Sequence, residues 1–262
     1  MNQLLFATYH PEELALYRRR AEQLQCGLEI HAFSNPALLA ANGDLKRVVA
    51  TFEKQLAGFE GVLGFHGAFY DMVSASVDPD VVALTLQRYR QNVEVAHHLG
   101  GRYVVFHANY MGGFKLADYR DGWHRRQVTF WRAFMEEVGE RGVTVLLENM
   151  WADDPSIIVD ILAEVDHPRL QACLDVGHVY LFSDRPIEVW IDALEPFLYS
   201  CHLNNHNGRV DLHWSLGHGV IDYPPILRKL KELARPPFMT LEMGDWETIA
   251  ASLPYFDLTM PA

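Results

Sequence analysis

Short apolar runs alternate with longer amphipathic segments along the 262 residues of the chain. The short runs have the composition of buried strands, whereas the longer segments show the apolar period of helices. Regular alternation of this kind is typical of repeated βα units and a parallel sheet. Strands are predicted at residues 3–9, 27–33, 61–67, 102–108, 142–150, 170–178, 198–205 and 237–243.

A helix is predicted after each strand, and local signals mark two of the starts. Pro11 with the acidic pair Glu12 and Glu13 suits a first helical turn, and Asp78 before Pro79 opens a long helix that runs to about residue 99. Other helices are predicted near residues 44–57, 123–141, 155–165, 186–194 and 223–234, with a short one at the end. Eight such units favour a single-domain (β/α)8 TIM barrel over residues 1–262, with a doubly wound open sheet as the alternative.

Composition narrows the class of protein further. With 49% hydrophobic residues, the chain is able to bury one sizeable core. It has neither a long apolar span nor a leader-like start, so a soluble, cytoplasmic protein without membrane association is expected. Cys26, Cys173 and Cys201 form no close pair, which argues against a disulfide framework. The net charge of −12 argues against a broad basic face for nucleic acid.

Polar residues end six of the predicted strands. In a barrel of this class the functional mouth lies at the carboxyl ends of the strands, so these side chains are expected to converge. They are His66, His107, Glu148, Asp175, His202 and Glu242, and His178, Asp211 and His213 follow in the next segments. Imidazole and carboxylate groups are the usual ligands of divalent metals. A single histidine at a strand end is more often structural, but the convergence predicts a metal site.

The remaining histidines and glycines of interest have simpler interpretations. His97 and His98 lie late in a predicted helix, where a favourable contact with the helix dipole explains them. His31 lies inside the second predicted strand and does not end it, so no function is assigned to it. His218 lies between Gly217 and Gly219, in a tight turn before the helix at residues 223–234.

Aromatic and basic residues near the predicted strand ends are candidates for substrate contact. The aromatic candidates are Phe69, Tyr70, Tyr110, Trp151, Tyr180 and Trp214. Tyr110, Trp151, Trp214 and Arg209 are taken as the candidate substrate pocket. Lys115, Arg120 and Arg209 are candidates for binding a phosphate or carboxylate of the substrate, although a solvated surface position is the simpler interpretation of each.

An ordered set of short motifs resembles a known family. FHG, VFH, LLEN, CLDVGH, CHLNN, DLH, GHGVID and TLE occur in that order. The chain thereby resembles the xylose isomerase-like TIM barrels, which include sugar isomerases and epimerases and endonuclease IV. For the isomerase and epimerase branch the resemblance implies one divalent metal held by Glu148, Asp175, His202 and Glu242, with His178 contacting substrate. Glu148 and Glu242 would also serve as the catalytic acid and base.

For the endonuclease IV branch, the resemblance implies three zinc ions and a larger ligand set. The additional ligands would be His66, His107, His178, Asp211 and His213. All these residue types are present, so the ligand set alone does not separate the two branches. The loops at residues 34–44 and 68–78 contain no lysine or arginine, which disfavours nucleic acid as a partner.

The function predicted from the sequence is that of a metal-dependent sugar or sugar-phosphate isomerase or epimerase. Its chemistry would be proton abstraction beside a carbonyl through a metal-stabilised enediolate. The cofactor would be one to three ions of zinc, manganese, magnesium, cobalt or iron. A zinc-dependent phosphodiesterase like endonuclease IV is the alternative, and a non-catalytic sugar-binding barrel is a third. The sequence leaves the substrate, the metal and a homo-oligomeric state open.

Overall fold

Eight parallel strands of the described chain close into a barrel. The computed structural model describes residues 3–114 and 116–259. The strands are β1 (Leu4–Thr8), β2 (Gly27–Ile30), β3 (Leu63–His66), β4 (Tyr103–His107), β5 (Thr144–Glu148), β6 (Leu170–Asp175), β7 (Leu198–Leu203) and β8 (Phe238–Leu241). Each pairs with the next, and β8 pairs with β1, so the predicted barrel is confirmed and the open sheet is wrong.

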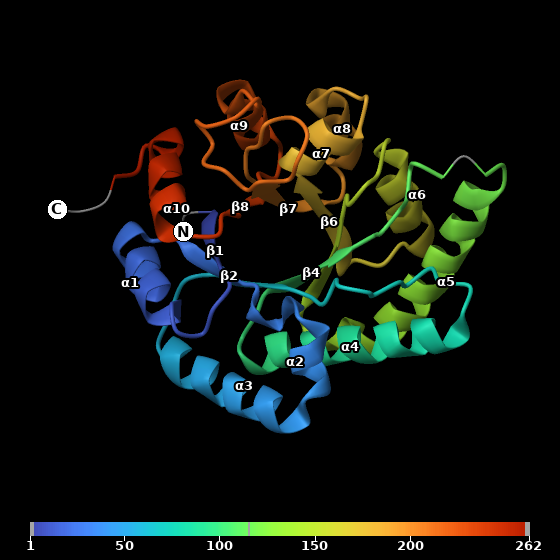
Figure 1. The fold of residues 1–262 in the computed structure, drawn as a ribbon, viewed down its shortest axis with the longest axis horizontal. Helices are drawn as coiled ribbons and strands as arrows, with labels where there is room; N and C mark the ends of the chain where they lie inside the picture. The colour runs from blue at the N-terminus through green and yellow to red at the C-terminus, as the bar shows by residue number, and fades with distance from the viewer. Residues whose placement is uncertain (1–2, 115, 260–262) are drawn as a thin grey trace.

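Helices form a ring around the strands, as Figure 1 shows. One main helix follows each strand, as the alternation of apolar runs predicted. In chain order these are α1 (Leu14–Leu24), α3 (Asn42–Leu56), α4 (Pro79–His98), α5 (Tyr119–Val138), α6 (Ser156–Val165), α8 (Ile187–Leu194), α9 (Tyr223–Glu232) and α10 (Trp246–Ser252). Short 3-10 turns lie at Ala32–Ser34, Gly139–Arg141 and Leu253–Phe256.

Two short helices at the mouth of the barrel were not predicted. Helix α2 (Pro36–Ala40) lies in the segment after β2 and is capped by Asn35, whose side chain accepts from the Ala37 amide. Helix α7 (Val176–Phe182) begins with residues 176–178, the last three of the nine that were predicted as the sixth strand. That strand assignment is wrong because the Asp175 carboxylate accepts from the His178 amide at 2.6 Å and starts a helix there.

The apolar core has two parts. Most buried apolar side chains lie between the strands and the surrounding helices, where Trp131 and Trp190 are fully buried. A smaller cluster contains Leu5, Val62, Tyr103, Val105, Leu146 and Cys173. Gly64 makes room for it, because a Cβ there would lie 2.2 Å from the Tyr103 ring. Fully burying a large apolar side chain contributes roughly 1.5–3 kcal/mol.

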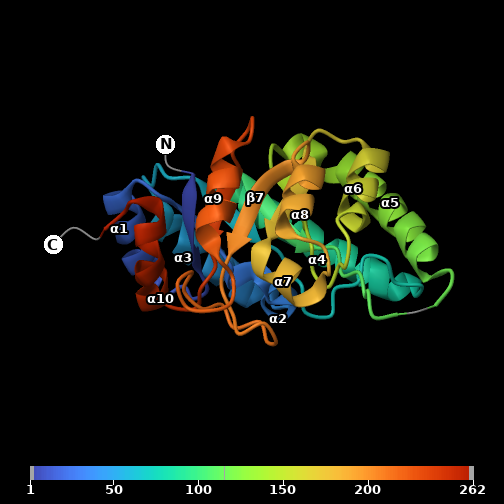
Figure 2. The ribbon, with the colours of Figure 1, turned by 90° about the horizontal axis from the view of Figure 1, so that it is seen from above.

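The carboxyl ends of the strands all open on one side of the barrel. In Figure 2 the arrow of β7 points to the side on which α2, α7 and the loop after β7 lie. This is the side at which barrels of this class carry their functional residues. Among the described residues, no helix combines the length and apolar character needed to cross a membrane.

Candidate active site and metal centre

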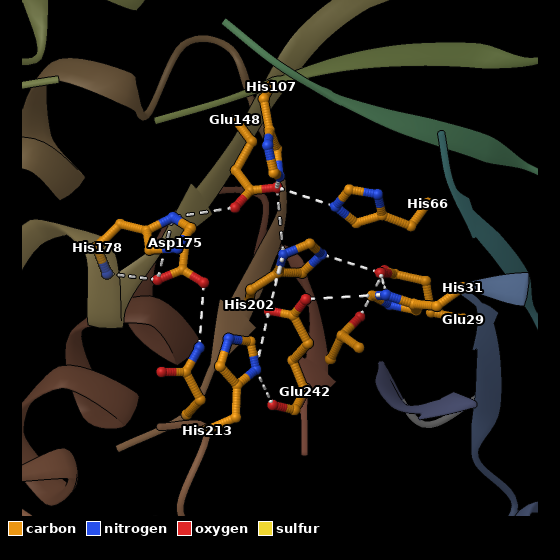
Figure 3. Close-up of polar contacts among 12 residues, drawn as sticks. Glu29, His31, His66, His107, Glu148, Asp175, His178, His202, His213 and Glu242 are labelled. Atoms are coloured by element: carbon orange, nitrogen blue, oxygen red, sulfur yellow. Dashed lines mark hydrogen bonds and ion pairs between the residues drawn. The ribbon is translucent and has the colours of Figure 1, made fainter. Parts of the chain in front are cut away.

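The six predicted strand-end residues converge on the mouth of the barrel, and His202 lies at their centre (Figure 3). All six side chains are buried. His202 Nδ1 lies 3.5 Å from Glu148 Oε2 and 3.2 Å from Glu242 Oε2. The two carboxylates therefore flank one imidazole nitrogen from β5 and from the segment after β8.

The donor atoms at this centre fit a divalent metal. Four groups of three residues bring their ligand atoms within 4.8 Å of one another: His31, His66 and Glu242; His66, Glu148 and His202; Glu148, Asp175 and His178; and Asp175, His202 and Glu242. In the described chain, Glu148 Oε2, His178 Nδ1, His202 Nδ1 and Glu242 Oε2 are buried without a hydrogen-bond partner. Buried polar atoms without a partner cost free energy, and coordination of a cation would satisfy them.

Three histidines surround Glu148. His107 Nε2 and His66 Nε2 lie 3.3 Å and 3.5 Å from its Oε2, and His178 Nδ1 lies 3.1 Å from its Oε1. Burial opposes ionisation of this carboxyl, but nearby His107 and His202 outweigh it and hold the pKa of Glu148 well below its usual range. Glu148 is therefore a buried carboxylate whose charge is balanced by imidazoles.

Glu242 has a different environment. Burial raises its pKa to about 7, the charges of Glu148 and Asp175 add to the rise, and His202 and His213 oppose it. His213 Nδ1 donates to the Glu242 carbonyl oxygen at 2.7 Å. The backbone of His213 is left-handed, with φ at 49°, which is a strained conformation for a residue with a side chain.

Asp175, His178 and Asp211 connect the centre to the helix and loop beyond it. Asp175 Oδ2 accepts a hydrogen bond from the side-chain amide of Asn204 at 3.1 Å, and Asp175 Oδ1 caps α7. Gly177 allows this close approach, because a Cβ there would lie 2.3 Å from Asn204 Oδ1. The His178 and His213 Nε2 atoms lie 3.4 Å and 3.2 Å from Asp211 Oδ2.

Two residues of β2 and its end join the site although the sequence analysis gave them no role. Glu29 is fully buried. Its Oε1 atom lies 2.9 Å from His31 Nε2 and 2.9 Å from His202 Nε2. Its Oε2 accepts from the Tyr103 hydroxyl at 2.6 Å and from Thr240 at 2.8 Å. The placement of His31 inside a strand was wrong, since β2 ends at Ile30 and His31 follows it directly. A charged residue in an apolar run, as in GLEIH, was the available signal.

A cavity of about 400 Å³ lies over this centre. Its walls are formed by Tyr9, His31, Ser34, His66, Phe69, Tyr70, His107, Glu148, Met150, His178, Asp211, His213, Glu242 and Gly244. Of the aromatic residues predicted near the strand ends, Phe69 and Tyr70 line this cavity, and Tyr9 lines it although it was not predicted to. No lysine or arginine is among these lining residues of the described chain.

The other candidates for substrate contact lie outside this cavity. Tyr110 is buried against Tyr119 and Trp123, and Trp151 lines a separate cavity. The Trp214 backbone pairs with Asn205, and the Trp214 ring contacts His218 at 4.4 Å between centroids. Tyr180 and Arg209 are exposed, and exposed Arg120 bonds to Ser156 and Asp160. Lys115 lies outside the described residues.

Comparison with known proteins identifies relatives of the whole barrel. The sequence model of a family described as "Xylose isomerase-like TIM barrel" matches residues 9–256. A curated relative, "Probable endonuclease 4" of Thermoplasma acidophilum, is 25% identical over an alignment of 199 residues that covers 68% of this chain and 66% of the relative. The chain thus spans about two thirds of the length of the curated relatives it matches.

Two solved structures resemble this one closely in shape. The TTHB071 protein from Thermus thermophilus, solved after soaking with ZnCl2, has a TM-score of 0.77 at 27% identity and aligns over 98% of this chain and 97% of its own. A D-tagatose 3-epimerase-like protein has a TM-score of 0.77 at 20% identity, over 97% of this chain and 94% of its own. At 20% identity, the likeness to the D-tagatose 3-epimerase-like protein shows a shared fold.

Proposed function

Because the chain belongs to the xylose isomerase-like TIM barrel family, we propose that it is a metal-dependent enzyme that isomerises or epimerises a small sugar or sugar phosphate. One observation carries the proposal: two buried carboxylates, Glu148 and Glu242, line a cavity of about 400 Å³ and lie on either side of the buried His202. That volume is in the range of sites for small molecules. Sugar 3-epimerases share the fold at 20% identity or less, which guides the choice of test compounds.

The metal in this proposal is held by Glu148, Asp175, His202 and Glu242. These residues supply carboxylate and imidazole donors, and three of them have buried ligand atoms without a hydrogen-bond partner in the described chain. When bound, a divalent cation polarises a carbonyl and makes the hydrogen on the neighbouring carbon more acidic. Zinc, manganese, magnesium, cobalt and iron all suit such a mixed donor set.

Glu148 and Glu242 move the proton. Each has an Oε2 atom without a hydrogen-bond partner among the described residues, and they approach the centre from either side of His202 (Figure 3). One carboxylate takes the proton from carbon on one face of the substrate, and the other returns a proton on the opposite face. Return to the same carbon inverts it. Return to the former carbonyl carbon, together with transfer of the hydroxyl proton of the first carbon to the former carbonyl oxygen, gives isomerisation.

The remaining cavity residues orient the substrate and exclude water. His178 lies between Glu148 and Asp211, where it is placed to hydrogen-bond a substrate hydroxyl. Phe69 packs on His66 and His107, with ring centroids 5.5 Å and 4.9 Å apart. An apolar wall of this kind suits the apolar face of a sugar and lowers access of water to the reacting carbon.

The experiment is proton exchange in heavy water. The protein is loaded with Mn²⁺ and incubated with a panel of ketopentoses, ketohexoses and their phosphates, and deuterium at carbons next to the carbonyl is followed by NMR. Exchange and formation of the epimer or isomer of at least one sugar are expected. Metal-loaded protein that exchanges no proton of any panel member contradicts the proposal.

A second candidate is cleavage of phosphodiesters at abasic sites. It is favoured by His66 and His107 near Glu148 and by the 25% identity to "Probable endonuclease 4". Against it, the cavity lining of the described chain offers no lysine or arginine, whereas nucleic-acid binding depends on cationic contacts with phosphates. An abasic-site duplex should remain intact with zinc-loaded protein, and efficient nicking would favour this second function.

A further inference from the structure

The loop after β7 contains an exposed asparagine followed by a glycine, Asn207 and Gly208. A glycine has no Cβ to shield its backbone nitrogen, so this nitrogen is able to attack the side-chain carbonyl carbon of a preceding asparagine. Asp211 and His213 follow in the same loop and line the cavity over the candidate metal centre. A covalent change at Asn207 would therefore occur in the segment that carries two residues of the candidate site.

A buried histidine faces the nitrogen that would attack. The Gly208 N–H donates to His206 Nδ1 at 2.9 Å. His206 Nε2 lies 3.0 Å from the Gly177 carbonyl oxygen, which only accepts, so Nε2 carries the hydrogen and Nδ1 carries the lone pair. The ring is fully buried and is held at both nitrogens. Its Nδ1 thus has the tautomer and the distance that a general base requires.

Two backbone amides face the side-chain oxygen of Asn207. The N–H groups of Arg209 and Val210 donate to Asn207 Oδ1 at 2.9 Å and 3.0 Å. Attack on Cγ would place negative charge on this oxygen. Donors at about 2.7–3.1 Å from such an oxygen form an oxyanion hole. The attacking nitrogen, the base and the oxyanion donors therefore all come from consecutive residues of one loop.

We propose that residues 206–210 form a self-modification site, at which Asn207 is converted to aspartate or isoaspartate through a cyclic imide. The Gly208 nitrogen forms a bond to Asn207 Cγ and gives its proton to His206 Nδ1. The bond from Cγ to Nδ2 then breaks, and Nδ2 leaves as ammonia with the proton that His206 returns. Water opens the imide at either carbonyl. Both products carry a new negative charge, and isoaspartate also lengthens the backbone by one carbon.

The rival interpretation is that the same hydrogen bonds protect Asn207. Bonds from an asparagine side chain to the amides that follow it are common in turns. They also restrain the side chain, and a restrained side chain that does not turn toward the Gly208 nitrogen would close the ring more slowly than in the unfolded chain. The two interpretations thus predict opposite effects of unfolding on the rate.

A second asparagine followed by glycine provides a control within the same chain. Asn42 and Gly43 form the beginning of α3, in a different part of the barrel from the loop after β7. The rate at Asn42 reports the general chemistry of such a pair under the conditions of the assay. It should not depend on His206.

The test follows the loss of side-chain amide in the full-length protein at neutral pH. Peptide mass spectrometry measures the rates at Asn207 and Asn42, and electron-transfer fragmentation separates aspartate from isoaspartate. Folded natural protein is compared with the same protein in guanidinium chloride and with His206→Gln. Glutamine keeps a donor for the Gly177 carbonyl and an acceptor for the Gly208 N–H, but it is not a base. Asn207 is expected to react faster in the folded protein, and His206→Gln should slow it at least about tenfold without changing Asn42.

Two results would overturn the proposal. One is a rate at Asn207 in the folded natural protein that is equal to or below the rate in the unfolded protein, which would support protection. The other is an unchanged rate at Asn207 in His206→Gln that circular dichroism shows to be folded. If His206→Gln is unfolded, the comparison of folded with unfolded natural protein decides alone. Neither result bears on the proposed function, because the assay measures no turnover of a sugar.

Discussion

Two cavities lie at the mouth of the barrel, and the smaller one holds the buried carboxylates to which we assign the chemistry. The inner cavity measures about 400 Å³ and contains Glu148 and Glu242, which are 1% and 6% exposed. The outer cavity measures about 640 Å³, and its carboxylates, Asp153 and Asp184, are exposed. Charges withdrawn from water interact far more strongly than exposed ones. Burial of the ionisable groups, more than volume, therefore distinguishes a candidate catalytic site.

The two cavities have no lining residue in common, although the segment after β5 and helix α7 contribute residues to both. Met150 lines the inner cavity and Trp151 the outer, and the left-handed backbone at Trp151, with φ at 57°, marks the turn between them. Along α7, His178 lines the inner cavity and Phe182, one turn later, lines the outer. One turn of α7 thus exchanges a polar wall residue for an aromatic one.

Removal of the metal is expected to have the largest effect. A cation that stabilises developing charge contributes several kcal/mol to the transition state, so chelation should lower turnover on the order of a thousandfold or more. The measurement is proton exchange before chelation, after it, and after Mn²⁺ is restored. Chelated protein that is free of metal by elemental analysis and still fully active would show that the inner cavity works without a cation.

Replacement of either inner glutamate is expected to have the next largest effect. Glu148→Gln and Glu242→Gln remove the groups that accept and return the proton, so turnover should fall roughly 10²–10⁴-fold. Asp153→Asn in the outer cavity is the matched control and should leave turnover unchanged. The readout is deuterium incorporation at the carbon beside the carbonyl. Normal incorporation in either glutamine variant would refute the assigned role of that glutamate. The inner cavity would then be no more important for turnover than the outer one.

A smaller effect is expected below the inner cavity, at Glu29. Glu29→Gln removes the carboxylate charge that lies 2.9 Å from Nε2 of His202, a proposed metal ligand, so metal affinity should fall about 10–100-fold. The measurement is the Zn²⁺ dissociation constant by competition with a chromogenic chelator. Glu22→Gln, at an exposed residue of α1, is the control. Unchanged affinity in Glu29→Gln would mean that Glu29 does not orient the ligands.

The fold was predictable because the residues of each strand and main helix carry a local pattern. Apolar runs of strand length, separated by amphipathic segments, gave every strand in its observed order. Helix α7 was missed because a single side-chain contact, from Asp175 to the His178 amide, overrides the apolar pattern of the preceding strand. Contacts of this kind leave no periodic signal in the sequence.

The site was predictable in part for a similar reason. Residues that end strands meet in space whenever the strands are parallel, so His66, Glu148 and Asp175 could be placed from the sequence. His31 was missed because the predicted second strand was drawn three residues too long. Tyr110 and Trp151 were taken as substrate contacts, but the direction of a side chain in a loop is not fixed by any period. Tyr110 lies instead against Trp123, and Trp151 faces the outer cavity.

Trp151 gives the smallest expected effect and the sharpest test of the contrast between the cavities. It is 42% exposed, and Trp151→Ala removes no contact with the inner cavity. The free energy of unfolding changes by no more than about 0.5 kcal/mol at such surface positions. Because Trp151 does not line the inner cavity, kcat/KM should stay essentially unchanged. Phe69→Ala is the control, because its ring packs on His66 and His107 inside the inner cavity and its loss should raise KM clearly. A tenfold rise in KM for Trp151→Ala, with Phe69→Ala unaffected, would mean that the substrate extends into the outer cavity and that Trp151 contacts it, as the sequence predicted.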